Sequence, residues 1–400
     1  MANMADIDPH PAHSSVALST VELLARLVAF DTTSRNSNLP LIDFIRGYLG
    51  EHGVAFTESR SRDGNKANLH AIIGPQVAGG LALSGHVDTV PVDGQAWQSD
   101  PFTLRDDGHG RLYARGAADM KGFVASMLAA VPALQRLTLA RPLHLFITFD
   151  EETSMAGARR LIADLSDRGL RPELCVVGEP SLMQPILGHK GRLAARATVR
   201  GRAGHSSDPA RGVNAVHAAA RAIGWLADEA DRLQRDGPFA EGFSPPHTTL
   251  QVGTMGGGQI LNIIPERAEF SIEWRPVPGH DAHAALDALA RHVAATLEPA
   301  MRAVDPECGF RFEVVDWVPG LSLPSEHPLA TLVRQAAGSN GGGTVSFATE
   351  GGLYEEAGIP TIVCGPGSIA QAHAPDEWVA RDQLDASDAF ILQLARRLAA

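Results

Sequence analysis

Side chains that could bind a metal ion or move a proton gather at five places in this sequence. They are Gly85-His86-Val87-Asp88, Asp119 within RGAADMKG, Asp150-Glu151-Glu152, Gly178-Glu179-Pro180 and His373 within QAHAP. Imidazole nitrogen and carboxylate oxygen are suitable ligands for divalent ions of hard to borderline character. Most of these places follow short apolar runs, where open α/β sheets bind ligands. The set therefore predicts a metal site with room for two ions bridged by a carboxylate, and one Glu left over as a base.

Three of these places also have a simpler structural explanation when each is taken alone. Asp119 stands where a helix N-cap is expected, and the acids at 150–152 could stabilise a helix start. His86 and Asp88 project to the same side of an extended chain, so Asp88 could orient a metal-binding imidazole or merely cap a turn. The whole set favours the metal site, and the sequence has no HExxH, GxxxxGK[ST] or GxSxG pattern that would indicate another chemistry.

Short apolar runs alternate with amphipathic segments in the parts of the chain that carry these residues. We expect helices over 21–30, 41–51, 123–134, 156–165 and 329–337, and strands over 69–73, 81–84, 143–149, 174–177 and 361–364. Continuous apolar strands between helices are typical of a parallel sheet covered on both faces. The predicted fold class is therefore α/β with a mainly parallel sheet.

The pattern changes between about residues 191 and 319. Ala268–Trp274 alternates apolar and polar residues, as a strand with one buried face does. Further strands are expected over 193–199, 248–252 and 312–317, with helices over 214–233 and around 286–297. The order β-α-β-β-α-β predicts an inserted split-βαβ (ferredoxin-like) module.

These patterns divide the chain into four segments. Residues 1–15 are predicted to be a disordered tail, 16–190 the first part of the main domain, 191–319 the inserted module and 320–400 the second part. The main domain begins with a capping box, Ser19-Thr-Val-Glu22.

Composition excludes several classes of function. Acidic residues outnumber basic ones by 46 to 34, for a formal charge of −12, which argues against binding to nucleic acid or to an anionic membrane. The longest apolar stretch, between Lys121 and Gln135, is too short to cross a bilayer. Three widely spaced cysteines exclude a disulfide framework and predict a reducing, cytoplasmic location.

The motifs, in their order, resemble those of the co-catalytic zinc peptidase and deacylase family. The stretches that carry the resemblance are SGHVDTVP, RGAADMKG, TFDEET, GEP and AHAPDE, and it covers nearly the whole chain after Leu18. The family includes aminoacylase, carboxypeptidase G, succinyl-diaminopimelate desuccinylase and acetylornithine deacetylase. The stretch FATEGG…GIPTIVCGPGSIAQAHAPDEWV most resembles the acetylornithine deacetylase branch.

The resemblance implies a role for each residue of the set. The implied ligands of two Zn²⁺ ions, for which Co²⁺ or Mn²⁺ could substitute, are His86, Asp119, Glu152, Glu179 and His373. Each ion would have one histidine and one glutamate, and Asp119 would bridge them, with a cis peptide before Met120. Glu151 would be the general base that takes a proton from a water shared by the ions, and Asp88 would orient His86.

The inserted module would serve as a lid and dimerisation domain, according to the same resemblance. His205 would reach across a homodimer and stabilise the developing oxyanion. Asn262 and Arg275 would bind the α-carboxylate of the substrate, and an Arg fork suits that group. From the residues alone, His205 could instead be a surface-loop histidine, and Arg275 could pair with Glu273 or Glu266.

The implied reaction is removal of the acetyl group from N2-acetyl-L-ornithine, a step of arginine biosynthesis. An anionic contact for the ornithine amine would come from Glu350 or Glu355, either of which could equally be a solvated or capping acid. Succinyl-diaminopimelate desuccinylase and a broader N-acyl-amino-acid hydrolase or dipeptidase stay open as alternatives. So does a metal-binding or assembly protein without turnover, although Glu151 and all five implied ligands are present.

Overall fold

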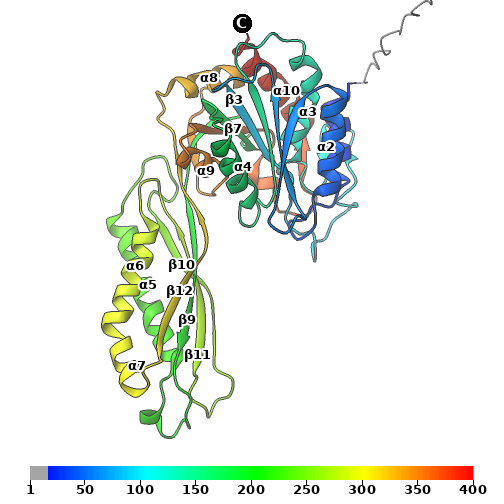
Figure 1. Ribbon diagram of the computed structural model, residues 1–400. Helices are drawn as coiled ribbons and strands as arrows, with labels where there is room; N and C mark the ends of the chain where they lie inside the picture. The colour runs from blue at the N-terminus through cyan, green and yellow to red at the C-terminus, as the bar shows by residue number, and fades with distance from the viewer. Residues whose placement is uncertain (1–16, 400) are drawn as a thin grey trace, which may run out of the picture.

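The computed structural model describes residues 17–399, and the predicted tail at 1–15 lies outside them. Figure 1 shows two lobes, of which the elongated one, drawn in green and yellow, is the inserted module. The predicted fold class is confirmed, because a large, mostly parallel sheet is accompanied by a separate antiparallel sheet. We propose that each sheet forms the core of its own domain. The domain boundaries at residues 191 and 319 stay a prediction.

The main sheet runs through both halves of the chain. Its strands, in order across the sheet, are β1 (Ala55–Arg60), β2 (Ala67–Ile73), β6 (Leu143–Thr148), β3 (Leu81–His86), β7 (Leu174–Pro180), β15 (Thr361–Gly365), β8 (Ile186–His189) and β13 (Leu321–Ser322), with β14 (Gly343–Val345) beside β8. The central strands β6, β3, β7 and β15 are parallel, whereas β1, β2 and β13 pair antiparallel to their neighbours. The carboxyl ends of the central strands consequently meet at one edge.

Helices cover both faces of this sheet. One face carries α1 (Thr20–Val28), α2 (Leu39–Glu51), α3 (Lys121–Leu134), α8 (Pro328–Ala337) and α10 (Arg381–Arg396), and the other carries α4 (Ala156–Asp167) and α9 (Gly351–Glu356). Successive strand residues alternate between the two cores: Leu83 packs with the first group and Ala82 with the second. The predicted capping box at the start of α1 is confirmed, with both Ser19–Glu22 hydrogen bonds present.

The inserted module has its own antiparallel sheet and core. Its strand order is β10 (Thr249–Gly257), β11 (Arg267–Arg275), β9 (Arg192–Arg200) and β12 (Gly309–Val318), and its helices are α5 (Ala215–Asp236), α6 (Ala282–Thr296) and α7 (Glu298–Val304). This is the ferredoxin-like order expected for a split βαβ unit. The helices pack against one face around Trp274 and Phe270, while the other face carries the polar residues of β11.

A small sheet closes the fold near the end of the chain. It consists of β4 (Arg105–Asp106), β5 (Arg111–Tyr113) and β16 (Trp378–Ala380), and short 3₁₀ turns occur at Pro209–Arg211 and Ile369–Gln371. Because β16 pairs with β5, the segment after His373 is held beside the segment before Asp119.

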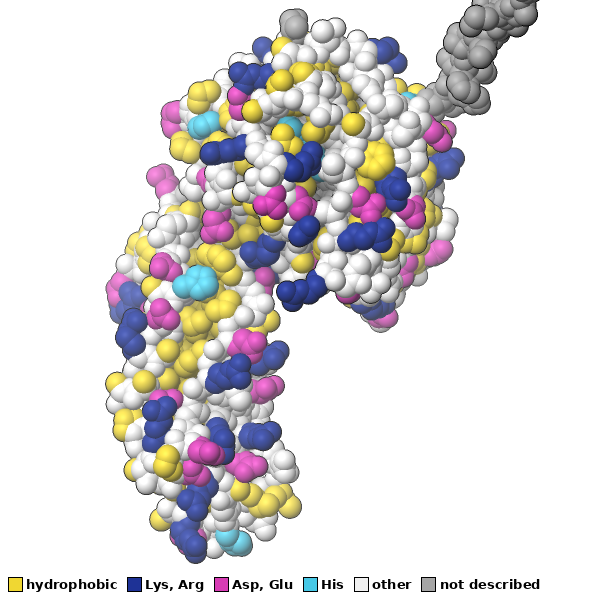
Figure 2. All heavy atoms as spheres, viewed as in Figure 1, with side chains coloured by type: hydrophobic (Ala, Val, Ile, Leu, Met, Phe, Trp, Pro, Cys, Tyr) yellow, Lys and Arg dark blue, Asp and Glu magenta, His cyan; other side chains and the backbone are white. Residues whose placement is uncertain are grey.

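Charge is distributed unevenly between lysine and arginine. The only lysines in the sequence are Lys66, Lys121 and Lys190. Lys121 and Lys190 are buried, and the side chain of Lys66 is 15% exposed. Figure 2 shows that basic and acidic side chains are interspersed over the visible face of both lobes. Among the described residues, no helix is both long enough and apolar enough to cross a membrane.

Candidate metal centre

The strand ends of the main sheet bring one predicted metal-binding cluster together. His86 is the last residue of β3, and Glu179 lies near the end of the adjacent β7. The Nε2 atom of His86 is 3.0 Å from Oδ1 of Asp119 and 3.6 Å from Oε1 of Glu179. All three side chains are buried. His86, Asp119 and Glu179 therefore form one compact set of nitrogen and oxygen ligands.

A second cluster shares Asp119 with the first. The Nε2 atom of His373 is 3.2 Å from Oδ2 of Asp119 and 3.0 Å from Oε2 of Glu152. The side chain of His373 is 52% exposed, and its backbone has a positive φ of 62°. Asp119 thus turns one carboxylate oxygen toward each histidine, which is the arrangement of a bridging ligand.

Asp119 does not cap the helix that follows it. The N-cap of α3 is Met120, and no side chain makes a cap hydrogen bond there. The peptide bond between Asp119 and Met120 is cis, as the resemblance implies. The alternative interpretation of Asp119 as an N-cap is therefore wrong, because its carboxylate is directed at His86 and His373 instead.

Asp88 holds the turn that carries both glutamates. Its Oδ1 accepts a hydrogen bond from the backbone N–H of Glu151 at 3.0 Å, and its Oδ2 accepts from that of Glu152 at 3.2 Å. The Nδ1 atom of His86 lies 3.0 Å from the Asp88 carbonyl oxygen and 3.6 Å from its Oδ1. With Nδ1 donating to the carbonyl, Nε2 is the ring nitrogen that faces Asp119 and Glu179. The acids at 150–152 do not start a helix, since α4 begins at Ala156.

The site holds several buried carboxylates close together, and positive charge nearby would reduce their mutual repulsion. Burial, together with the charge of Glu179, raises the pKa of Glu151 well above its usual range. Burial and the neighbouring Asp119 raise the pKa of Glu152 to about 7. Hydrogen bonds that His373 donates to Asp119 and Glu152 raise its pKa to about 10. Raised pKa values of buried acids, beside a histidine whose pKa is raised by carboxylates, indicate a site that a bound cation would stabilise. The nitrogen and oxygen donor set fits divalent metal ions such as zinc.

The predicted catalytic residue His205 and the predicted substrate-binding residues Asn262 and Arg275 lie in the inserted module, outside both ligand clusters. The segment of His205 pairs with that of Ile263, and the backbone N–H of Ser206 donates to the Asn262 carbonyl at 3.1 Å. Arg275 ends β11 on the side of the main domain and pairs with Glu273 at 2.8 Å. Since β11 has nine residues, its ends lie about 27 Å apart. Within one chain, His205 and Asn262 therefore lie together, and Arg275 lies far from both.

The two acids considered for the substrate amine differ in position. Glu350 is buried, and its Oε2 is 3.3 Å from the Ser84 hydroxyl and 3.4 Å from that of Tyr354. Burial raises the pKa of Glu350 to about 7. Burial and the charge of Asp119 raise the pKa of Glu179, with a smaller contribution from the charge of Glu350. Glu355 accepts a hydrogen bond from the backbone N–H of Ser322 at 2.7 Å, as a capping acid does. In this structure, Glu350 lies within the protein beside the centre and does not face solvent.

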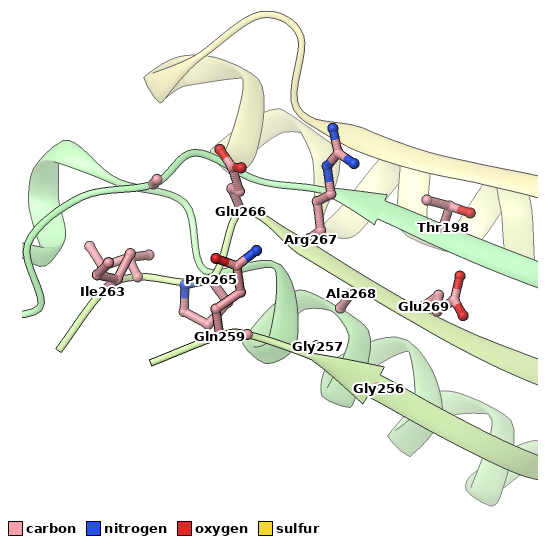
Figure 3. Close-up of a pocket in the computed structure, with 13 residues that line it drawn as sticks. Thr198, Gly256, Gly257, Gln259, Ile263, Pro265, Glu266, Arg267, Ala268 and Glu269 are labelled. Atoms are coloured by element: carbon pink, nitrogen blue, oxygen red, sulfur yellow. The ribbon is translucent and has the colours of Figure 1, made fainter. Parts of the chain in front are cut away.

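A pocket of about 680 Å³ lies in the inserted module and not at the metal centre. Figure 3 shows its lining, formed by the Gly256–Gly257 end of β10, the loop with Gln259, Ile263 and Pro265, and residues of β9 and β11. The same loop carries Asn262. This hollow therefore lies at the end of the module where His205 and Asn262 are found.

Glu377 ends the AHAPDE motif and is not among the predicted site residues. The structure places its carboxylate against the backbone N–H of Asp119, at 3.0 Å. The sequence feature that could have indicated Glu377 is its place four residues after His373, in the motif that predicted His373 as a metal ligand. The contact itself joins residues 258 positions apart in the chain, so that only the fold reveals it.

Comparisons with known proteins find relatives that match most of this chain. The sequence profile of peptidase family M20/M25/M40 matches residues 82–397. The acetylornithine deacetylase of Edwardsiella ictaluri (strain 93-146) is 36% identical over 388 residues, which cover 94% of this chain and 97% of that protein.

Two solved structures share the whole fold. The M20 family metallo-carboxypeptidase Sso-CP2 from Sulfolobus solfataricus has a TM-score of 0.73 at 17% identity, covering 95% of this chain and 99% of the other. The YXEP protein of Bacillus subtilis, described as a dinuclear metal binding peptidase from the M20 family, has a TM-score of 0.66 at 15% identity, covering 95% and 97%. The profile match and the curated relative show that this chain belongs to peptidase family M20/M25/M40, as a metal-dependent amide hydrolase.

Proposed function

We propose that this protein hydrolyses N2-acetyl-L-ornithine to acetate and L-ornithine at a centre of two zinc ions. The observation that carries the proposal is the pair of ligand clusters that share Asp119, with Glu151 beside them. The choice of substrate is supported by the relative named acetylornithine deacetylase, which aligns with 94% of this chain. Such a reaction would supply ornithine to arginine biosynthesis.

His86 and Glu179 would hold one ion, His373 and Glu152 the other, and Asp119 both. When bound, the two ions would polarise the amide carbonyl and make a water molecule acidic enough to lose a proton near neutral pH. Asp88 contributes indirectly, because it orients His86 and fixes the backbone of both Glu151 and Glu152.

Glu151 is the residue that we propose to move the proton. Its carboxylate belongs to neither ligand cluster, and burial raises its pKa, so that it is able to hold a proton between two steps. It would accept a proton from the attacking water and pass it to the leaving amine of ornithine. A general base that becomes a general acid must hold the proton between the two steps, and a raised pKa favours this.

The inserted module supports a homodimeric active site. His205 and Asn262 lie at the end of the module far from Arg275, and β11 separates them by about 27 Å. A single chain in this arrangement cannot bring all three to one small substrate. We propose that Arg275 acts in its own subunit, while His205 of a second copy steadies the oxyanion and Asn262 binds the carboxylate. The buried, unpaired cysteines Cys175, Cys308 and Cys364 support a cytoplasmic location.

The proposal is tested by a panel of substrates on metal-free protein reconstituted with zinc. Rates are measured on N-acetylornithine, N-acetylmethionine and succinyl-diaminopimelate. We expect the highest kcat/KM for N-acetylornithine. A preference for the succinyl compound would overturn the substrate assignment, and zinc binding without hydrolysis of any amide would indicate a protein without turnover.

A further inference from the structure

One buried ion pair outside the proposed ligand set lies directly behind it. Nη1 of Arg115 is 2.8 Å from Oε2 of Glu377, and each side chain is only 1% exposed. Arg115 precedes the Asp119 loop in sequence, and Glu377 follows His373. Burying two charges costs free energy of solvation. The other contacts of the two side chains show what this buried pair does in the fold.

Glu377 organises the loop that ends at Asp119. Its Oε2 accepts from the backbone N–H of Gly116 at 3.0 Å, and its Oε1 accepts from those of Ala118 at 2.9 Å and Asp119 at 3.0 Å. Three hydrogen bonds to one carboxylate fix the path of the backbone from 116 to 119. The direction of the Asp119 carboxylate is set by the same backbone, so that the position of Glu377 controls it.

Arg115 extends the same network to His373. Its Nη2 donates to Oε1 of Gln95 at 2.6 Å, and Nε2 of Gln95 donates to the His373 carbonyl at 2.9 Å. Nη1 also approaches the Ala374 carbonyl at 3.4 Å. Since the backbone of His373 has a positive φ, which is unfavourable for a residue with a side chain, outside contacts must hold it there.

We propose that Glu377 is a positioning residue for both metal positions, acting on Asp119 directly and on His373 through Arg115 and Gln95. The proposal rests on the function proposed above, because it assumes that Asp119 and His373 bind metal. Glu377 touches neither the ions nor the substrate. It keeps the two ligands, which come from segments far apart in the chain, at one fixed separation.

The chemistry of the contacts requires a carboxylate. An amide at 377 would direct one NH₂ group at backbone N–H groups or at Arg115, all of which are donors. It would also leave the buried Arg115 guanidinium without its counter-charge. Glu377→Gln, which preserves size, is therefore the sharpest change, and Glu377→Asp restores the charge with a shorter reach.

The experiment measures zinc affinity by competition with a chelator on the full-length protein, together with kcat and KM on N-acetylornithine. For Glu377→Gln we expect affinity at both positions to fall by about 10- to 100-fold, as for other residues that orient metal ligands. We expect kcat at limiting zinc to fall while KM changes little. Glu377→Asp should recover part of the affinity.

Two further variants separate positioning from general stability. Gln95→Leu should weaken only one of the two zinc positions, because Gln95 reaches His373 and not Asp119. Asp388→Asn is the matched control: Asp388 is a carboxylate on α10 that accepts from the Thr20 hydroxyl at 2.6 Å and contacts neither ligand loop. It should lower the melting temperature and leave zinc affinity unchanged.

Unchanged zinc affinity in folded Glu377→Gln protein would overturn the inference, as would equal losses of affinity in Glu377→Gln and Asp388→Asn. If Glu377→Gln does not fold, the inference is tested with Gln95→Leu. Wild-type zinc affinity at both metal positions of that variant would overturn the inference. The proposed function fails separately, by a wild-type protein that binds two zinc ions and does not hydrolyse N-acetylornithine.

Discussion

The two proposed metal positions share Asp119 and differ in what holds their histidines. His86 ends a strand in the middle of the main sheet and is 1% exposed, whereas His373 stands on a loop and is 52% exposed. Glu179 lies within β7, while Glu152 lies in a turn. One position is therefore built into the sheet, and the other is assembled by loops around the shared aspartate.

This difference separates two ways of making a ligand site. At the His86 position, the hydrogen bonds of the sheet fix the ligands, and burial makes their charges depend on each other. At the His373 position, side-chain contacts from Gln95 and Glu377 replace the sheet as the support. We expect changes at the His86 position to alter the free energy of unfolding. We expect changes around the His373 position to alter mainly its metal affinity.

The largest effect is expected for the residue that both positions share. Asp119→Ala removes a ligand from each ion at once, so we expect loss of both zinc ions and hydrolysis at the background rate. Metal content after gel filtration and the rate on N-acetylornithine measure this. Retention of two tightly bound ions would show that Asp119 does not bridge them. The two metal positions would then not share a ligand.

The next effect comes from a residue that belongs to neither position. Glu151→Gln keeps the shape of the side chain and abolishes its basicity, so kcat should fall by about 10²- to 10⁴-fold, the usual contribution of a general base. Metal content should stay at the wild-type value, since Glu151 is not in either cluster. A near wild-type rate with normal zinc content would exclude this role.

The two histidines should respond differently in metal-free protein. His86→Ala leaves Asp119 and Glu179 buried without their positive partner, and removing one member of such a pair destabilises by about 3–5 kcal/mol. The exposed His373→Ala should change stability by less than about 1 kcal/mol. Urea unfolding in the presence of a chelator measures both values. Equal losses would contradict the distinction between a sheet-built and a loop-built position.

A smaller effect at acid pH helps to separate metal loss from unfolding. His70 on β2 lies 2.9 Å from His144, and burial, with the charge of His144, lowers the pKa of His70 to about 3. The unfolded chain, with an ordinary pKa of about 6.5, binds a proton in this range that the folded chain does not. Stability should therefore be complete above pH 6.5 and decline as pH falls toward 3.

Thermal unfolding of chelator-treated protein between pH 7.5 and pH 5 measures this decline. The control is His70→Phe, placed beside Phe146, which removes the titrating group. We expect it to show a weaker dependence on pH, whatever its absolute melting temperature. A dependence equal to that of the wild type would assign the acid sensitivity to other groups.

Sequence patterns were sufficient for features that depend on local order. Alternation and apolar runs predicted the strands that end at His86 and near Glu179, and the strand order of the inserted module follows from its βαββαβ pattern. Helix α10 was not predicted, although Leu384, Phe390, Ile391 and Leu394 are spaced to form a buried face. Its apolar positions lie among acidic residues, which obscure the period.

Features that depend on closure of the chain were beyond sequence reasoning. No spacing rule pairs His86 with Glu179 and His373 with Glu152, because each pair joins separate strands or loops. The burial of Glu350 has the same origin, since α9 brings it under the sheet only when the second part of the chain returns. The role of Glu377 likewise requires the pairing of β16 with β5.

The near absence of accessible lysine has a practical consequence. Lys121 and Lys190 are buried, and Lys66 is held by Asp150. Reagents that attack amines, including most dyes and bifunctional cross-linkers, will find few targets on the described part of this protein. A homodimer formed through the inserted module would escape lysine cross-linking, so its capture needs reagents directed at carboxylates or arginines, which are abundant on both lobes.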